Sequence, residues 1–300
     1  MPHVNDCPVF VSSSDAYSDI WPAFFQIFRR EWPEYRGAIY LNTEHKTFSC
    51  KGLNIVCTQV GEQSHFGETL HAGLKKVEGD VVLFFMIDYF IERKVDVPCL
   101  NRCYEEFLKQ TPSTLFLCDI VFPKTEHVKR LENCYRFVPS SLLNFSSESG
   151  WFSFQTAFWR KADMLRLIAR WEDPWHAEFY GFLRSKIHRP EVWYTQKSPV
   201  VYDKSGVLHN RGRWNRDALS RIDLNGIDLD FSAREDCVPL RFANLRIVLY
   251  DILPYWSNIK SFASVMWLAV KKWKHADNVS KGEGGLRRSY QLSRASLSGN

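Results

Sequence analysis

The chain has 300 residues, of which 45% are hydrophobic and 24% are charged, with a formal net charge of +5. This length is enough for one large α/β domain with a full core, and the composition excludes disorder before the C-terminal tail. The N-terminus lacks the basic start and apolar run of a signal peptide, and no stretch of about 18 apolar residues predicts a membrane span. We therefore expect a protein that stays on the cytoplasmic side.

Charge and cysteines narrow the function classes further. Residues 270–300 contain seven basic and two acidic residues, so they carry the whole excess of +5 and residues 1–269 are formally neutral. A basic end on a neutral body predicts attraction to an anionic surface and argues against extensive nucleic-acid binding. The eight cysteines form no Cys-x-x-Cys pairs and have no His partners at zinc-ligand spacing. They predict reduced core thiols.

The first part of the chain alternates strands and helices. Apolar runs predict strands, and apolar residues at three- and four-residue spacing predict helices. In chain order these are a strand over 8–12, a helix over 20–32, strands over 37–41 and 53–57, a helix over 66–77 and a strand over 81–87. This β-α-β-β-α-β run predicts a mainly parallel, doubly wound, Rossmann-like α/β sheet.

The later elements are less regular, and residues 120–150 stay unassigned apart from a loop over 140–150. The patterns predict a helix over 98–110, strands over 113–119 and 151–159, helices over 160–171 and from 173 onward, and a last strand over 200–202. We expect one main domain over 1–216 and an irregular connector over 217–240. An amphipathic helical appendage over 241–276 and a basic, disordered tail over 277–300 follow.

The strand over 81–87 is the central element of this pattern. Its uninterrupted apolar residues predict a strand buried on both faces, and it ends in Asp88. Ligands of open α/β sheets bind outside the carboxyl ends of the strands, so Asp88 is expected to face a ligand crevice. The alternative is that Asp88 caps the turn into residues 92–94.

Short motifs spread over residues 8–216 resemble, in their order, those of GT-A-type glycosyltransferases of bacterial surface-polysaccharide (lipopolysaccharide or capsule) biosynthesis. The motifs are Ser12–Asp15, Ile39–Glu44, Met86–Ile91, Phe154–Arg160, Pro174–Phe179 and Gly212–Asn215. The resemblance implies a GT-A-like fold and transfer of a sugar from a nucleotide-diphosphate sugar to a glycan or lipid-linked glycan. Members of this family commonly carry two acids at the end of the central strand, whereas here Ile87 takes the place of the first.

Such a transfer requires a pocket for base and ribose and a counter-charge for the departing diphosphate. Polar residues at strand ends are the candidates, with ordinary turn residues as the alternative for each. The predicted donor-binding residues there are Ser13, Asp15, Tyr17, Asn42, Glu44 and Asp88.

Two schemes for the diphosphate stay open. Asp88 could hold Mg²⁺ or Mn²⁺ with His209 as a second ligand, because such cations take one or two carboxylates plus phosphate oxygens. Alternatively His209, Arg211 and Arg213 close over the phosphates without a metal. The single acid at the strand end slightly favours the second scheme, and a solvated arginine loop is the remaining alternative.

Glu178 is the predicted general base of an inverting transfer. It lies in the first turns of a predicted helix between Trp175 and Phe179, where partial desolvation raises a carboxylate pKa into the range for base catalysis. The alternative is an acid that stabilises the helix N-terminus. Gln155 and Trp175 are the predicted acceptor-binding residues, with core packing as the alternative for the aromatic side chain.

The appendage carries an apolar stripe from Tyr255 to Trp273 that is bordered by lysines. This pattern predicts a helix that lies on the anionic inner leaflet, and hence a peripheral membrane protein. The alternative is a helix that packs on the catalytic domain or on a second subunit.

Other functions fit the sequence less well. A catalytically silent GT-A-like binding or assembly protein stays open because of Ile87. A sugar-phosphate nucleotidyltransferase would need a glycine-rich basic loop where the chain has Ser12–Asp15. A spatial carboxylate pair for glycoside hydrolysis is not excluded by sequence, whereas a P-loop motif is absent.

Overall fold

The computed structural model describes residues 2–117, 125–128, 131, 134–137, 152–209, 212–237 and 259–271. These residues form a nine-stranded sheet in the order β3-β2-β1-β4-β8-β5-β9-β7-β6, and a separate two-stranded sheet. The predicted loop over 140–150, residues 241–258 and 272–276 of the predicted appendage, the tail over 277–300 and Arg211 lie outside the described residues.

The first half of the sheet follows the predicted β-α-β-β-α-β order. Its elements are β1 (Val9–Ser12), α1 (Trp21–Glu31), β2 (Ala38–Leu41), β3 (Asn54–Cys57), α2 (Phe66–Lys76) and β4 (Val81–Met86). Strand β1 pairs in parallel with β2 on one side and with β4 on the other, where Ser12 lies opposite Met86. The order of strands reverses between β1 and β4, so a crevice is expected outside the carboxyl ends of these two strands.

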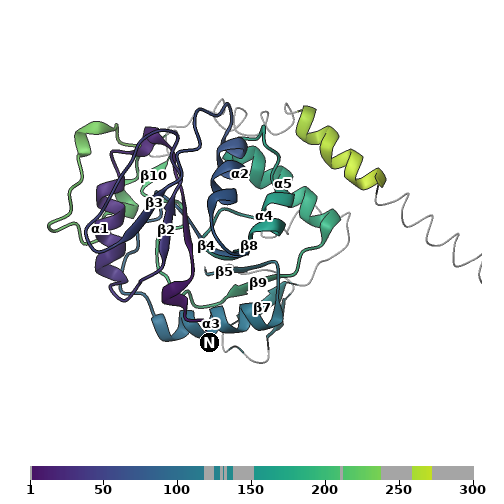
Figure 1. Cartoon of the computed structure of the whole chain (residues 1–300), viewed down its shortest axis with the longest axis horizontal. Helices are drawn as coiled ribbons and strands as arrows, with labels where there is room; N and C mark the ends of the chain where they lie inside the picture. Colours follow the sequence, from purple (N-terminus) through teal and green to yellow (C-terminus); the bar gives the residue numbers. More distant parts are fainter. Residues whose placement is uncertain are drawn as a thin grey trace, which may run out of the picture.

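Helices cover both faces of the sheet, as Figure 1 shows. Successive side chains of β4 point to opposite faces. Phe85 packs against Phe24 and Phe28 of α1, whereas Phe84 stacks on Phe10 on the other face. Helix α2 covers that second face, where Gly73 lies close to Phe10. The prediction of a doubly wound α/β sheet is confirmed.

The second half adds antiparallel strands. It comprises α3 (Val97–Gln110), β5 (Thr114–Phe116), β6 (Thr125–His127), β7 (Cys134–Phe137), β8 (Ala157–Arg160), α4 (Lys161–Leu167), α5 (Pro174–His188) and β9 (Val192–Thr195). Strand β8 runs antiparallel between β4 and β5, and β7 runs antiparallel to β9. The other seven strands share one direction, so the sheet is mainly parallel. Because β8 is reversed, the residues that precede it lie at the edge where β4 ends.

Several predicted boundaries differ from the structure. The strand expected over 151–159 is restricted to β8, and the helix expected over 160–171 ends at Leu167. The last strand expected over 200–202 was wrong, since Tyr202 forms only an isolated bridge with Ile91. The strand in this region is β9 instead, which pairs in parallel with β5.

Local sequence explains where α5 begins and ends. The Asp173 carboxylate accepts a hydrogen bond from the backbone nitrogen of His176 at 2.8 Å, and Pro174 occupies the first helical position. Both features are typical of helix N-termini. The helix ends at Arg189, which adopts a left-handed conformation with φ of 52°. These caps fix the position of the helix that carries Glu178.

After β9 the chain returns to the body of the domain. It forms β10 (Leu208–His209), β11 (Arg213–Trp214), α6 (Arg216–Leu219) and a 3₁₀ turn, η4 (Phe231–Ala233). The segment predicted as a connector is irregular between these turns but is tied to the domain. Glu235 and Cys237 exchange backbone hydrogen bonds with Trp214. A further helix spans 259–271, and no helix of the described residues is long and apolar enough to cross a membrane.

Candidate functional site

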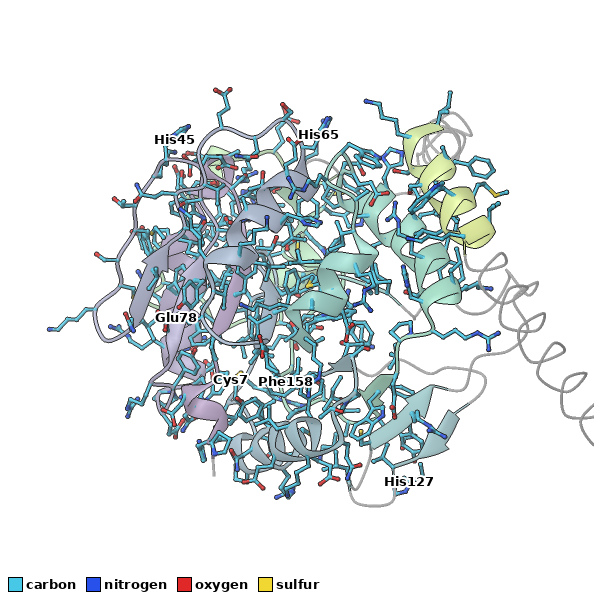
Figure 2. All side chains as sticks on the ribbon, turned by 45° about the vertical axis from the view of Figure 1, so that its right-hand side comes forward. Cys7, His45, His65, Glu78, His127 and Phe158 are labelled. Carbon is cyan, nitrogen blue, oxygen red and sulfur yellow. The ribbon has the colours of Figure 1, made fainter. Side chains whose placement is uncertain are left out.

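The candidate site lies at the edge of the sheet where β1, β2 and β4 end. In Figure 2 His45 and His65, from the segments after β2 and β3, lie at this edge, and Cys7, just before β1, lies toward the opposite end. Residues 13–19 follow β1, residues 42–46 follow β2, Asp88 follows β4, and residues 152–156 lead into the reversed β8. The topology therefore brings the predicted site residues to one edge.

Asp88 is the most unusual group at this edge. Its side chain is partly buried, and its Oδ1 atom is shut off from solvent and has no hydrogen-bond partner among the described residues. Burial raises the pKa of Asp88 from 3.8 to about 7. A buried carboxylate oxygen without a partner is costly, so it is expected to serve a bound group. Turn capping, the alternative from the sequence, does not use this oxygen.

The turn that precedes β10 lies directly against Asp88. The backbone nitrogen of Val207 donates to the Asp88 carbonyl oxygen at 2.8 Å. Gly206 has φ of +75°, and a Cβ atom at this position would lie 2.4 Å from Oδ2 of Asp88. Glycine is therefore required twice here, by its backbone conformation and by the close approach of the carboxylate.

Gly206→Ala is expected to displace the turn or the Asp88 carboxylate and to weaken donor binding. The matched control is Gly79→Ala, because Gly79 has the same φ of +75° but nothing within 4 Å of its Cβ position. Both variants should lose about 1 kcal/mol of unfolding free energy from backbone strain, and only Gly206→Ala should also raise the donor Michaelis constant. Equal donor kinetics in the two variants would remove the Asp88 contact from the site.

Arg234 packs against Tyr17 in the segment that follows β1. Burial, and secondarily the charge of Asp88, raise the pKa of Tyr17. The Arg234 guanidinium lies 5.0 Å from the centre of the Tyr17 ring. Arg234 also pairs with Asp19 at 2.6 Å and donates to the Gly212 carbonyl oxygen. Arg234 therefore holds the Tyr17 ring in place in the segment after β1.

Asp15 and Glu44 join the loops after β1 and β2. The backbone nitrogen of Asp15 donates to Oε2 of Glu44 at 2.5 Å, and the backbone nitrogen of Glu44 donates to Oδ1 of Asp15 at 3.1 Å. Burial alone would raise the pKa of Asp15, but hydrogen bonds from the backbone of His45, Lys46 and Glu44 lower it overall. Both carboxylates hold the shape of the crevice.

Two predicted donor residues are engaged inside the protein. Asn42 is only 1% exposed, its Nδ2 donates to the Thr69 carbonyl oxygen, and its Oδ1 accepts from the Thr58 hydroxyl. Asn42 therefore points into the core under α2 and is withdrawn from the predicted donor pocket. Ser13 accepts a hydrogen bond from the Trp21 indole at 2.7 Å, which fixes the start of α1.

Gln155 connects the segment before β8 to Tyr89, the residue after Asp88. Its Nε2 donates to the Tyr89 hydroxyl at 2.9 Å and to the Lys204 carbonyl oxygen at 3.1 Å, and its Oε1 accepts from the Tyr202 hydroxyl. The Tyr89 and Tyr202 rings stack with centroids 4.9 Å apart. Gln155 therefore positions the segment before β8 beside the residue that follows Asp88.

Glu178 of α5 contacts the same segment before β8. Its Oε1 accepts hydrogen bonds from the backbone nitrogen of Phe154 at 2.8 Å and from the Ser153 hydroxyl at 2.9 Å. Burial raises the pKa of Glu178, although these two hydrogen bonds oppose the shift. A carboxylate with a raised pKa at this edge of the sheet suits proton transfer.

The remaining predicted residues lie on the rim. His209 and Arg213 face each other across the β10–β11 pair and are exposed, and Arg213 pairs with Glu235 at 3.2 Å. Trp175 is 56% exposed at the start of α5, three residues before Glu178. Arg211 lies outside the described residues.

A divalent cation fits only part of this arrangement. No group of three or more His, Cys, Asp or Glu side chains that could hold a metal occurs in the described part of the chain. The unpaired oxygen of Asp88 is suited to one contact with a cation whose other ligands come from a diphosphate. Both schemes for the diphosphate therefore stay open.

The sequence patterns missed Gly206, Arg234 and Tyr202. Arg234 lies in the segment interpreted as a connector, and its contacts with Asp19 and Tyr17 cross more than two hundred residues. A positive-φ glycine next to an aspartate is not visible in sequence. The paired tyrosines carry one signal, since Tyr89 follows the predicted strand over 81–87 and Tyr202 ends the one predicted over 200–202.

Comparisons with known proteins give remote matches only. No protein-family model matches the sequence, and no curated protein matches it. Among solved structures, the chain is similar to the glycosyltransferase TarS of S. aureus (residues 1–349) at 14% identity and a TM-score of 0.41, over 65% of this chain and 59% of that one. The structure of TarS 1–349 in complex with UDP-GlcNAc is similar at 13% sequence identity and a TM-score of 0.40, over 65% of this chain and 57% of that one. The bifunctional IspDF of Campylobacter jejuni is similar at 8% sequence identity and a TM-score of 0.38, over 72% of this chain and 54% of that one. The chain spans less than two thirds of each matched structure, so the roles of its residues rest on its own geometry.

Proposed function

We propose that this chain is a glycosyltransferase that uses a nucleotide-diphosphate sugar. Its acceptor is a glycan or lipid-linked glycan of surface-polysaccharide assembly, and it acts at the inner face of the cell membrane. The observation that carries the proposal is the Asp88 carboxylate at the point where the strand order reverses, because one of its oxygens is buried and has no hydrogen-bond partner within the part of the chain that the structure describes. The Tyr17 ring, held by Arg234 in the segment after β1, supports the same assignment.

Each group has a defined task in this proposal. Tyr17 stacks on the nucleotide base, and Asp88 accepts a hydrogen bond from the donor sugar or contributes one oxygen to a bound cation. A cation, when bound, supplies charge compensation to the diphosphate. His209 and Arg213 of the β10–β11 pair are candidates for direct phosphate contacts, and Arg211 is a third candidate on the basis of the sequence alone.

Glu178 acts on the acceptor. The acceptor hydroxyl attacks the anomeric carbon of the donor, its proton passes to Glu178, and the bond from that carbon to the diphosphate oxygen breaks. The departing diphosphate keeps the electron pair of this bond. Attack from the face opposite the diphosphate inverts the anomeric configuration. The raised pKa of Glu178 supports its role as the base.

A thermal-shift screen tests the donor class. UDP-, GDP-, CMP- and dTDP-sugars are compared with and without Mn²⁺, because a ligand present at about 100 times its dissociation constant adds about 2.7 kcal/mol to the unfolding free energy. At least one nucleotide sugar should raise the melting temperature. Stabilisation only by a nucleoside triphosphate with a sugar phosphate would favour the nucleotidyltransferase alternative. Donor binding without turnover on any glycan acceptor would favour a catalytically silent binding protein.

Asp88→Asn is expected to stabilise the ligand-free protein at neutral pH and to abolish donor-induced stabilisation. The pKa of Asp88 is higher in the folded chain, about 7, than its ordinary 3.8, so unfolding releases a proton between these values. This contribution is therefore most favourable below pH 3.8 and is lost as the pH rises to about 7, by on the order of 2–4 kcal/mol. Urea denaturation at pH 5 and pH 7.5 measures it.

The matched control for this pH dependence is Asp80→Asn, since Asp80 is an exposed acid before the other end of β4. The control should keep the wild-type difference between the two pH values. An Asp88→Asn protein that is less stable than wild type at pH 7.5 would contradict the interpretation, because Asp88 would then be a structural carboxylate.

A further inference from the structure

The helix over 259–271 is packed with its polar side inward. Ser261 and Val265 are buried, and Ser264 and Leu268 are partly buried, at the spacing of one helical face. The opposite face consists of large apolar side chains, with Ile259 77% and Trp267 62% exposed. Phe262, Met266 and Val270 complete this outward face. We refer to Ile259, Phe262, Met266, Trp267 and Val270 as the outer face.

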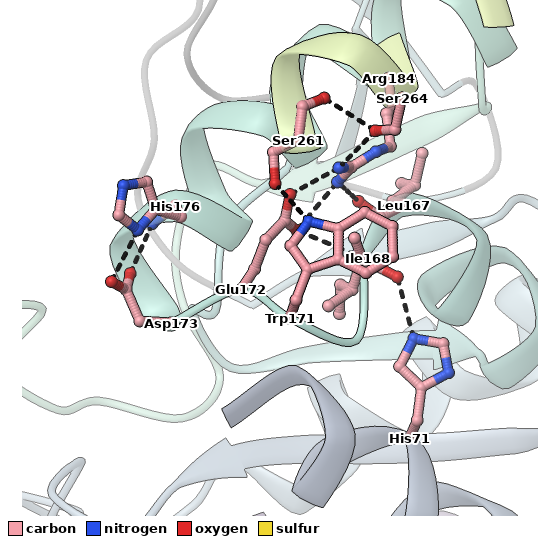
Figure 3. Close-up of polar contacts among 11 residues, drawn as sticks. His71, Leu167, Ile168, Trp171, Glu172, Asp173, His176, Arg184, Ser261 and Ser264 are labelled. Atoms are coloured by element: carbon pink, nitrogen blue, oxygen red, sulfur yellow. Dashed lines mark hydrogen bonds and ion pairs between the residues drawn. The ribbon is translucent and has the colours of Figure 1, made fainter. Parts of the chain in front are cut away.

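A buried ion pair fixes this orientation, as Figure 3 shows. Arg184 of α5 pairs with Glu172 at 2.5 Å, and both side chains are almost fully buried. Arg184 also donates to the Ser264 hydroxyl at 3.2 Å, and the Trp171 indole donates to the Ser261 hydroxyl at 2.9 Å. Buried charges need hydrogen-bond partners, and Ser264 supplies one to Arg184. Rotating the helix to bury its apolar residues would break these contacts.

The outer face concentrates the exposed apolar surface of the protein. Nine large hydrophobic side chains are exposed among the described residues, and five of them belong to this helix. Two more lie near the start of α5: Trp171 just before it and Trp175 in its first turn. The helix over 259–271 packs against this region through Trp171. Apolar surface gathered in one region marks an interaction site, whereas single exposed residues do not.

Lysines at the border of the outer face favour an anionic partner. Lys260 and Lys271 are exposed, and the Lys271 ammonium lies 5.0 Å from the centre of the Trp267 ring. The sequence continues with Lys272 and Lys274 within a segment of net charge +5 on a neutral body. Tryptophan next to lysine is typical of the headgroup region of an anionic bilayer. A second copy of the chain would instead bring like charges together across a two-fold interface.

We propose that the outer face docks on the surface of an anionic lipid bilayer, with the helix lying in the plane of the headgroups. Docking itself does not depend on the transferase activity. Its extension to the substrate rests on the proposed function: α5, which holds the docked helix through Arg184, also carries Glu178, three residues after the exposed Trp175. The base would then face acceptors that are anchored in the membrane.

Flotation of the full-length protein with vesicles tests the proposal. Wild type should float with phosphatidylcholine vesicles that contain phosphatidylglycerol, less at high salt, and not with phosphatidylcholine alone. Phe262→Gln/Trp267→Gln should lower the partition coefficient by about tenfold or more, because both side chains lose apolar contact with the bilayer. Lys260→Glu/Lys271→Glu should lower it by about tenfold on the anionic vesicles.

Val56→Gln is the matched control, since Val56 is an exposed apolar residue on the edge strand β3. It should float like wild type, and all variants should keep the wild-type melting temperature. Equal flotation of Phe262→Gln/Trp267→Gln and wild type overturns the proposal. A second result also overturns it: wild type sediments as a dimer and binds no vesicles, and the double substitution dissociates that dimer. Flotation requires no donor, so the two proposals fail separately. Wild type that a donor stabilises but that does not float refutes docking alone, and wild type that floats but that no donor stabilises refutes the transferase alone.

Discussion

Glu178→Gln is expected to lower the turnover number by about 10²–10⁴-fold and to leave donor affinity within about twofold of wild type. The amide oxygen of glutamine can still accept the hydrogen bonds from Phe154 and Ser153, so the segment before β8 keeps its place. The amide cannot take a proton from the acceptor hydroxyl. Steady-state kinetics with a matched donor-binding titration would separate the two effects.

Glu178→Ala provides the comparison, because it removes both the base and the acceptor of these hydrogen bonds. We expect it to lose about 1–3 kcal/mol of unfolding free energy in addition to activity. If Glu178→Gln keeps full turnover while Glu178→Ala is unstable, Glu178 is a structural residue and another group must act as the base.

Glu172→Gln is expected to lower the unfolding free energy by about 3–5 kcal/mol, which corresponds to roughly 6–15 °C in melting temperature. Glu172 is fully buried, and its two oxygens accept from Arg184 and from the backbone nitrogen of Ala169. Neutralising it leaves the Arg184 guanidinium buried without a counter-charge. Calorimetry and urea denaturation would measure the loss.

The control is Asp163→Ala, which removes the exposed pair between Asp163 and Arg166 on α4. That pair is expected to contribute less than about 1 kcal/mol. Similar losses in the two variants would mean that the buried pair contributes no more than a surface pair. Glu172→Gln should also weaken vesicle flotation, because the serine face of the helix over 259–271 depends on Arg184.

The sheet and its central acid were predictable because β4 is a continuous apolar run. Such a run is stable as a strand only when both of its faces are covered, so the sequence predicts both the strand and its burial. The position of Asp88 at the carboxyl end followed from the parallel topology. The pattern did not indicate that Oδ1 has no hydrogen-bond partner among the described residues, because the surroundings of Asp88 include the turn at Gly206, more than one hundred residues away.

Asn42 illustrates why side-chain direction was not predictable. A polar residue directly after a strand can face the crevice or the core, since successive side chains alternate. Asn42 turns inward because Gly73 leaves space beside it and because Thr58 and Thr69 satisfy its amide. These partners come from separate elements, so no local sequence pattern predicts them.

The missed strand β9 has a similar cause. Its residues Val192–Thr195 form a short apolar run that is buried and paired with β5, whereas the equally apolar Val200–Tyr202 finds no neighbouring strand. The difference lies in long-range pairing rather than in propensity.

Arg234 makes the crevice a composite of both ends of the domain. Its guanidinium binds Asp19 and the carbonyl oxygen of Ala16 on one side and that of Gly212 on the other. Engineering of a new donor preference would therefore have to exchange residues 13–19 and 206–236 as a matched pair. A chimera that inherits only one of these segments would lose the contacts of Arg234 that join them.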